Sequence, residues 1–283
     1  MKNTFLNTII ATAVLAGAQT LTAQTTILTD NFTVTSGGDV NNQLAGRQTG
    51  TQAVSGYTDA GQGGGNQTGN TGTYVGQPGG AGNSAYLLMY NGDALYNNLV
   101  LNSSLLGGQA LSVSFNIYQG TYNGQPAGDW TSFSIELPGS VPNPNNAVGF
   151  GFLVQGNNGM QVFDNGNDVF DKANQNYVTS DAWTVIFSGN AGGTGSPFGG
   201  TTYVQLYNNN DPANSETGLG LVYSGQLSTA LADGEQIGWH NYNPGFNENG
   251  IANLDIVATP EPATVALAAL GFTSLLIFRR RKS

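Results

Sequence analysis

The acidic residues and one histidine are the side chains of this sequence that could carry acid–base, nucleophilic or metal chemistry. The 283 residues include a single histidine, His240, and no cysteine. This count excludes a zinc site built from histidines or cysteines, and it also excludes disulfides and cysteine nucleophiles. His240 stands beside Trp239 without an accompanying G-x-S-x-G motif, so we interpret it as a structural residue rather than a member of a catalytic triad.

Three aspartates in the segment FDNGNDVFDKANQN are the candidate metal ligands. Asp164, Asp168 and Asp171 offer the hard oxygen donors that calcium takes in proteins. The segment departs from the D-x-[DN]-x-[DN]-G loop template because Gly166 occupies the third position. The alternative is a hairpin turn at Asn165-Gly166 flanked by solvated acids. Calcium is therefore the one cofactor that the sequence allows, and no other is expected.

Three tryptophans could stack on sugar rings: Trp130, Trp183 and Trp239. Their flat apolar faces and their indole N–H groups suit a saccharide surface. The alternative is packing in the core or across neighbouring strands of a sheet. The sequence leaves both open.

The polar part of the chain is unusually poor in charge. Only 8% of residues are charged, against roughly 25% in typical domains, while glycine contributes 42 residues. Between Gln24 and Ala258 lie 16 acidic residues and only two basic ones, Arg47 and Lys172. This excess of negative charge argues against nucleic acid and anionic lipid as partners of the central region.

Residues 1–23 have the layout of a secretory signal peptide. Lys2 provides the positive start, residues 5–15 are mainly apolar, and small residues follow up to Ala23. We expect a signal helix that the general secretion machinery recognises and signal peptidase removes between Ala23 and Gln24, with Ala18 as the second choice. The alternative is an amphipathic N-terminal helix retained in the mature protein.

Residues 259–283 form a second segment outside the predicted domain. Pro260, Glu261 and Pro262 precede sixteen uncharged residues, 263–278, which would span about 24 Å as a helix. We expect this helix to be a single, slightly short transmembrane segment. Four consecutive cations follow it and would remain in the cytoplasm, leaving the body outside: Arg279, Arg280, Arg281 and Lys282.

The Pro260-Glu261-Pro262 triplet, the apolar helix and the terminal RRRK cluster together resemble a PEP-CTERM sorting signal. The resemblance implies an exported protein of a Gram-negative bacterium that makes extracellular polysaccharide. It also implies a partner, a membrane protease or transpeptidase of the exosortase type, which reads the triplet and removes the tail. A plain, uncleaved anchor is the alternative.

The region 24–258 predicts an all-β fold. Short apolar or alternating runs are separated by Gly, Asn, Asp and Pro clusters, and about eleven strands can be assigned. In ALSVSFNIY, residues 110–118, apolar side chains at alternate positions would share one face. We therefore expect one domain built as an antiparallel two-sheet sandwich, or jelly roll.

The strand pattern resembles a concanavalin-like or laminin-G-like jelly roll. The resemblance lies in GFGFLVQGNNGMQVFDNG, in DAWTVIFS and TTYVQLYN, and in the last strand IANLDIVATPEP. Glycoside hydrolases occur on this fold with an E-x-D-x-x-E strand, but Glu136 has no acid two or five residues later.

A glycine-rich stretch at residues 55–85 departs from the strand pattern. It contains eleven glycines and almost no aliphatic residues, so it can bury little apolar surface. We predict a long exposed loop within the sandwich domain.

Three functional hypotheses follow. The first is a non-enzymatic protein, transiently anchored in the inner membrane and then released to the cell envelope, cell surface or extracellular matrix. The second is a lectin-like module that binds extracellular polysaccharide, with or without calcium. The third is a glycoside hydrolase, which requires two carboxylates about 5 to 10 Å apart in a groove.

Overall fold

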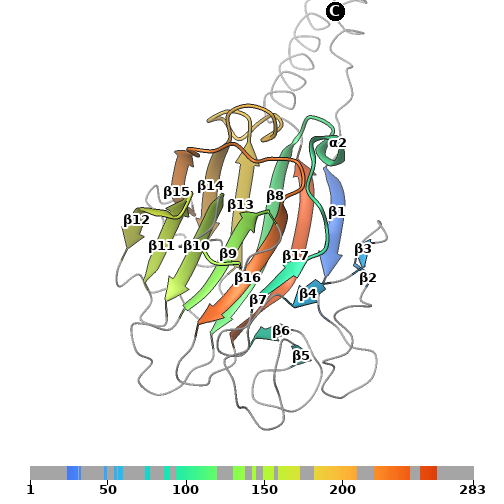
Figure 1. Ribbon diagram of the computed structural model, residues 1–283, viewed down its shortest axis with the longest axis vertical. Helices are drawn as coiled ribbons and strands as arrows, with labels where there is room; N and C mark the ends of the chain where they lie inside the picture. The colour runs from blue at the N-terminus through green and yellow to red at the C-terminus, as the bar shows by residue number, and fades with distance from the viewer. Residues whose placement is uncertain are drawn as a thin grey trace, which may run out of the picture.

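The computed structural model describes residues 24–30, 32, 48–49, 54–55, 57–59, 74–76, 86–89, 94–119, 130–137, 142–144, 149–155, 159–172, 182–208, 220–242 and 249–259. These residues form two antiparallel sheets packed face to face, as Figure 1 shows. The only helix among them is the four-residue α2 (Ser103–Leu106). The predicted all-β sandwich is confirmed.

One layer is an eight-stranded sheet in which β1 (Thr25–Asp30) pairs with β17 beside the main order of strands. That order is β15 (Leu221–Gln226), β14 (Tyr203–Asn208), β13 (Ala182–Ser188), β8 (Ala110–Gln119), β17 (Asn249–Thr259), β6 (Tyr86–Met89) and β5 (Tyr74–Gly76).

The second layer is a seven-stranded sheet. Its order is β12 (Asn167–Lys172), β11 (Met160–Asp164), β10 (Phe150–Gln155), β9 (Trp130–Glu136), β16 (Gln236–Tyr242), β7 (Ala94–Asn97) and β4 (Tyr57–Asp59). A separate two-stranded ribbon joins β2 (Gln48–Thr49) to β3 (Val54–Ser55).

Alternation along the strands determines which side chains enter the core. In β8, Leu111, Val113, Phe115 and Ile117 are all buried, while Ser114 and Asn116 on the opposite face are only partly covered. The alternation predicted for residues 110–118 is therefore confirmed. The predicted signal helix at 1–23 and the predicted transmembrane helix at 263–278 lie outside the described residues.

Within the glycine-rich range 55–85, the structure describes only residues 55, 57–59 and 74–76, and these lie in strands. Strands β4 and β5 fall within it, and β4 extends the seven-stranded sheet through its pairing with β7. Tyr57 is buried, and its hydroxyl donates to Asp30 Oδ2 at 3.1 Å. At β4, the first part of this range, an aromatic side chain is therefore buried where the composition predicts little burial.

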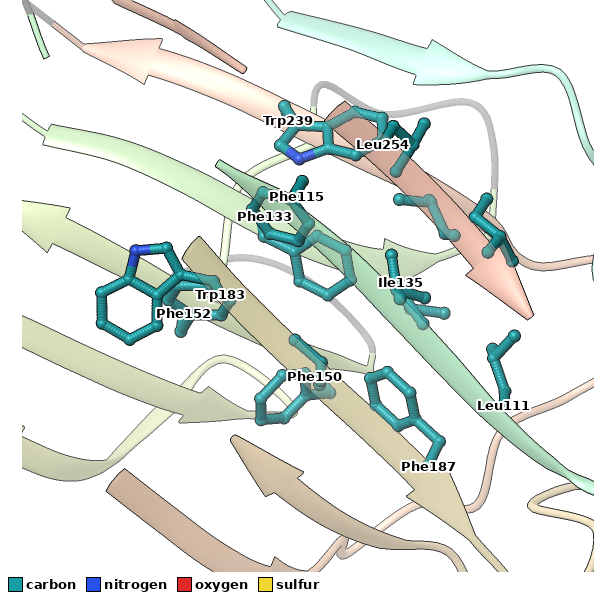
Figure 2. Packing of buried hydrophobic residues seen from close by; sticks show 14 of the residues in the cluster. Leu111, Phe115, Phe133, Ile135, Phe150, Phe152, Trp183, Phe187, Trp239 and Leu254 are labelled. Carbon is teal, nitrogen blue, oxygen red and sulfur yellow. The ribbon is translucent and has the colours of Figure 1, made fainter. Parts of the chain in front are cut away.

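Aromatic side chains from both layers fill the centre of the sandwich, as Figure 2 shows. Phe115 of β8 stacks on Phe133 of β9 at a centroid distance of 5.1 Å and meets Trp239 of β16 edge-on at 5.9 Å. Phe152 of β10 contacts Trp183 of β13 at 5.2 Å. Each contact joins the two sheets, so the aromatic residues supply much of the apolar burial that holds them together.

Polar contacts also join the two layers and the segments that connect them, away from the aromatic centre. Asp164 of β11 accepts from the backbone N–H of Ser228 at 2.7 Å and from its hydroxyl at 2.9 Å. Asn241 of β16 donates to Met89 O and accepts from Asn249 Nδ2, both at 2.8 Å. Because the chain has no cysteine, packing and such contacts must do what disulfides do in many exported domains.

Candidate functional site

The outward face of the seven-stranded sheet carries the candidate site, and β9 and β16 form its middle. Side chains alternate along a strand, so residues two apart share a face and point away from the core that Phe133 and Trp239 enter. Four cross-strand pairs lie on the outward face: Trp130 with Tyr242, Ser132 with His240, Ser134 with Gly238, and Glu136 with Gln236.

Three rings gather at one end of this face, which we call the aromatic end. Trp130 stacks on Tyr242 with ring centroids 5.5 Å apart and planes 23° from parallel. The imidazole of His240 meets Trp130 edge-on at 4.9 Å. Tyr242 is 45% exposed and Trp130 is partly exposed, whereas His240 is buried beside them. Part of this aromatic stack is therefore open to solvent.

Amide and carboxylate groups continue from the aromatic end across three more strands. Gln155 of β10 pairs with Trp130 in the sheet, and its Nε2 lies 3.3 Å from the Oε1 of Gln161 on β11. The Nε2 of Gln161 donates to the Oδ2 of Asp168 on β12 at 2.8 Å. We call the five residues from Tyr242 through Trp130, Gln155 and Gln161 to Asp168 the aromatic–amide row.

Burial determines the charge of His240. Loss of water lowers its pKa from 6.5 to about 4, against the opposing effect of a hydrogen bond to the backbone of Pro142. The imidazole is therefore neutral at neutral pH. Its Nδ1 has no hydrogen-bond partner among the described residues. These properties agree with the interpretation of His240 as a structural residue.

Residues 142–144 cross the outward face and form what we call the cover segment. A Cβ atom placed on Gly238 would lie 2.7 Å from the Cβ of Pro142, and one on Gly151 would lie 2.6 Å from the Cβ of Pro144. Real Cβ atoms do not approach so closely, so only glycine allows the two prolines to lie on β16 and β10. The cover segment thereby separates the aromatic end from the other end of β9 and β16.

Two carboxylates occupy that other end, which we call the glutamate end. Glu136 is 3% exposed, and its Oε1 accepts from the Ser134 hydroxyl at 2.9 Å and from the Asn143 N–H at 3.2 Å. Glu235, directly before β16, is 4% exposed, and its Oε2 lacks a hydrogen-bond partner within the described residues.

The carboxylates of Glu136 and Glu235 interact electrostatically. Burial raises the pKa of Glu235 to about 7; a hydrogen bond from the backbone of Ala232 opposes this rise, and the charge of Glu136 adds to it. A glycosidase needs its two carboxyl groups on either side of a substrate bond in a groove. Carboxylates as buried as these do not present that arrangement to a polymer.

The three predicted sugar-contacting tryptophans have different surroundings. Trp183 and Trp239 are buried in the core with Phe115 and Phe152, as Figure 2 shows. This placement corrects their assignment as sugar contacts, because neither indole has a face that a ligand could reach. Trp130 lies on the outward face, where the prediction requires it.

The three predicted calcium ligands do not converge on one cation. Both carboxylate oxygens of Asp164 accept from Ser228, and those of Asp168 accept from Gln161 and from the N–H of Phe170. Asp171 is exposed on β12 opposite Gln161. Within the described ranges, no group of three or more acidic or histidine side chains is arranged to hold a metal.

The alternative for this segment agrees with the structure. Asn165 and Gly166 both have positive φ, 51° and 75°, and link β11 to β12 as a tight hairpin turn. This conformation is the one for which an Asn-Gly pair is favoured.

The residues predicted for sorting and secretion lie at or beyond the ends of the domain. Gln24 is exposed next to β1, whereas Ala23 is outside the described residues. The rest of the predicted sorting motif also lies outside the described residues: Pro260, Glu261, Pro262, Arg279, Arg280, Arg281 and Lys282. In the part of the chain that the structure describes, no helix has the length and apolarity to cross a bilayer.

Four site residues were not found from the sequence: Tyr242, Gln155, Gln161 and Glu235. A predicted strand running from His240 to residue 242 would have placed Tyr242 on the same face as His240. No comparable signal marks Glu235, since its burial depends on contacts with residues about 100 or more positions earlier in the chain, including a bond from Leu101 N to its carbonyl at 2.8 Å.

Together these features define a jelly-roll sandwich with a sorting signal at its C-terminus. Residues 258–282 match the PEP-CTERM protein-sorting motif, which confirms the resemblance seen in the sequence. A search of curated proteins found no match to the chain.

Several solved structures are similar to this chain at low sequence identity. The exoplasmic/lumenal domain of VIP36, bound to Ca²⁺ and Man3GlcNAc, has 9% identity and a TM-score of 0.40 over 72% of this chain and 85% of that one. Peanut lectin with a 9-mer peptide has 12% identity and a TM-score of 0.41, covering 82% and 97%. The carbohydrate recognition domain of Emp47p also has 12% identity and a TM-score of 0.41, over 82% of this chain and 96% of that one.

Proposed function

We propose that this chain is a non-enzymatic protein of the cell envelope or extracellular matrix, delivered there as a folded sandwich. The observation that carries the proposal is the sorting motif at 258–282, which begins where the last strand of the sandwich ends. The general secretion machinery and signal peptidase would act at the N-terminus. An exosortase-type enzyme would then remove the tail that holds the body outside the inner membrane.

Cell fractionation combined with mass spectrometry of both chain ends tests this proposal. The expected mature protein begins near Gln24, lacks the Arg279–Lys282 cations and is found outside the inner membrane. Deletion of the sorting enzyme should return the full tail and the membrane location. A mature protein that is intact through Ser283 and remains in the membrane would contradict the sorting step.

A specific observation also favours saccharide binding as a second function. The aromatic–amide row places a partly exposed Trp130–Tyr242 stack beside hydrogen-bonding groups on β10, β11 and β12. Sugars present apolar C–H faces together with hydroxyl groups, so aromatic faces beside amides and a carboxylate suit them. An extracellular polysaccharide is the ligand class that the expected location would supply.

Binding of the secreted mature protein to glycans, with and without a calcium chelator, tests this second function. We expect Trp130→Ala to weaken binding at least tenfold. Tyr203→Ala, which removes a partly exposed tyrosine from the outward face of the other sheet, should leave binding unchanged. If glycan binding is lost only when the chelator is added, the binding depends on a calcium site outside the aromatic–amide row. If Trp130→Ala and Tyr203→Ala weaken glycan binding equally, the aromatic–amide row is not the binding site.

A further inference from the structure

The last strand of the sandwich runs directly into the sorting motif. Thr259 pairs with Ala110 of β8, and its hydroxyl donates to the Ala110 carbonyl at 3.3 Å. Ala258 is buried and pairs with Leu111 of β8 on one side and Thr25 of β1 on the other. The first two residues of the matched motif therefore belong to the folded domain.

The length of chain after β17 limits how far the body can stand from the membrane. Only residues 260–262 separate Thr259 from the predicted transmembrane segment at 263–278. Three residues span at most about 10 Å when fully extended. While the tail is in the membrane, the end of the sandwich at Thr259 must therefore lie against the membrane or against a protein embedded in it.

That end of the sandwich has a surface of its own, which we call the exit face. It consists of the segment from Val100 through α2, the turn at 232–235, and Leu137. The Ser103 N–H donates to Asp233 Oδ1 at 2.8 Å, and the Gly234 N–H donates to the Leu101 carbonyl at 2.9 Å. Figure 1 shows α2 at the end of the sheets where β8 begins, and β8 begins with the residue that pairs with Thr259.

Exposed apolar side chains mark the exit face. Val100 is 47% exposed and Leu137 is 53% exposed, and they are two of the four large exposed apolar or aromatic residues among those described. The side chain of Leu137 reaches within 3.7 Å of where a Cβ on Gly234 would stand, so it lies over the same turn that binds Leu101. Both residues are therefore available for contact near the point where the chain leaves the fold.

We propose that the exit face docks on the membrane-embedded tail-processing enzyme, and that cleavage occurs beyond Thr259 with β17 still paired. This inference rests on the proposed sorting function. The central region carries far more acidic than basic residues, which disfavours anionic lipid as the surface that the exit face meets. An apolar contact with the enzyme needs no favourable charge and would hold the scissile segment close to the catalytic groups.

Two changes to the full-length chain test the proposal in cells that contain the enzyme. Val100→Ser combined with Leu137→Ser should lower the fraction of cleaved chains at least threefold. Insertion of ten Gly/Ser residues between Thr259 and Pro260 should restore cleavage of that variant, because the body no longer has to approach the enzyme. Val169→Ser, which changes a side chain of 45% exposure on β12, is the matched control and should be cleaved like the wild type.

Each outcome is informative. A mature C-terminus upstream of Thr259, or a double variant cleaved as well as the control, would overturn the docking proposal. A defect that persists with the inserted residues would also overturn it, and thermal unfolding of the purified variants would separate a folding defect from a docking defect. Failure of the wild-type chain to be cleaved at all would instead remove the sorting function on which the proposal rests.

Discussion

The aromatic end and Glu136 of the glutamate end lie on the same face of β9 and β16, yet only the aromatic end is open to solvent. At the aromatic end, Tyr242 is about half exposed and Trp130 is partly exposed. At the glutamate end, Glu136 and Glu235 are almost fully buried. The cover segment lies between the two ends and donates a hydrogen bond from Asn143 to Glu136. The exposure of the side chains, rather than their residue type, therefore decides which end could bind a ligand.

Burial shifts the pKa values of the two ends in opposite directions, and both shifts favour the neutral side chain. Burial raises the pKa of Glu235 to about 7 and lowers that of His240 to about 4. Between these two values the acid is protonated and the base is unprotonated, so both side chains are neutral in the folded protein. Each neutral state reflects the high free energy of a buried charge that lacks a partner.

The largest expected effect comes from displacing the cover segment. Gly238→Val would place methyl groups where Pro142 and Tyr96 already stand, and the overpacking should lower the free energy of unfolding by about 3 kcal/mol. Urea unfolding measures this loss. Gly200→Val is the control, because a Cβ at Gly200 has no atom within 4 Å, and its stability should change little. Equal losses in the two variants would mean that the cover segment is not seated on Gly238.

The next effect concerns the glutamate end and depends on pH. The pKa of Glu235 is higher in the folded state than its ordinary 4.5, so its contribution to stability is complete below pH 4.5 and is lost as the pH rises through 7. Glu235→Gln removes this loss and should stabilise the protein by about 2 kcal/mol at pH 8, but by much less at pH 4. Unfolding curves across this range provide the measurement. A gain that is independent of pH would contradict a neutral, buried acid.

The aromatic end should show the reverse dependence at a smaller size. His240 has a folded pKa below its ordinary 6.5, so its contribution is complete above pH 6.5 and is lost as the pH falls toward 4. His240→Gln should therefore reduce the acid sensitivity of stability by about 1 kcal/mol between pH 7 and pH 5. In a variant that combines both changes, the two slopes should be absent together. A wild-type-like acid slope in His240→Gln would show that another group titrates.

The fold could be predicted far better than the site. Strand alternation at 110–118 and 203–208 follows from burying one face of a sheet. The alternation of apolar and polar residues is visible in the local sequence, so it is enough to predict these strands. The state of Glu235, in contrast, depends on Leu101 and Glu136, which only the folded chain brings close to it.

The tryptophans illustrate the same limit. Trp183 and Trp239 lie on faces fixed by alternation, but composition gives no information about which face of a sheet is covered. It is the structure that places Trp130 on the outward face, and the register of β9 with β16 then identifies Tyr242 as its partner.

The smallest effect on stability should come from Tyr242→Ala, and it separates folding from binding most clearly. Because Tyr242 is about half exposed, its loss should change the free energy of unfolding by less than about 0.5 kcal/mol. The same change removes the exposed half of the stack on Trp130, so saccharide binding should weaken while the thermal midpoint is unchanged. Titration of the mature protein with the cell's own polysaccharide gives the first quantity and calorimetry the second. If the midpoint falls while binding is unchanged, the aromatic end is a packing feature of β9 and β16, and burial no longer distinguishes a binding end from a structural one.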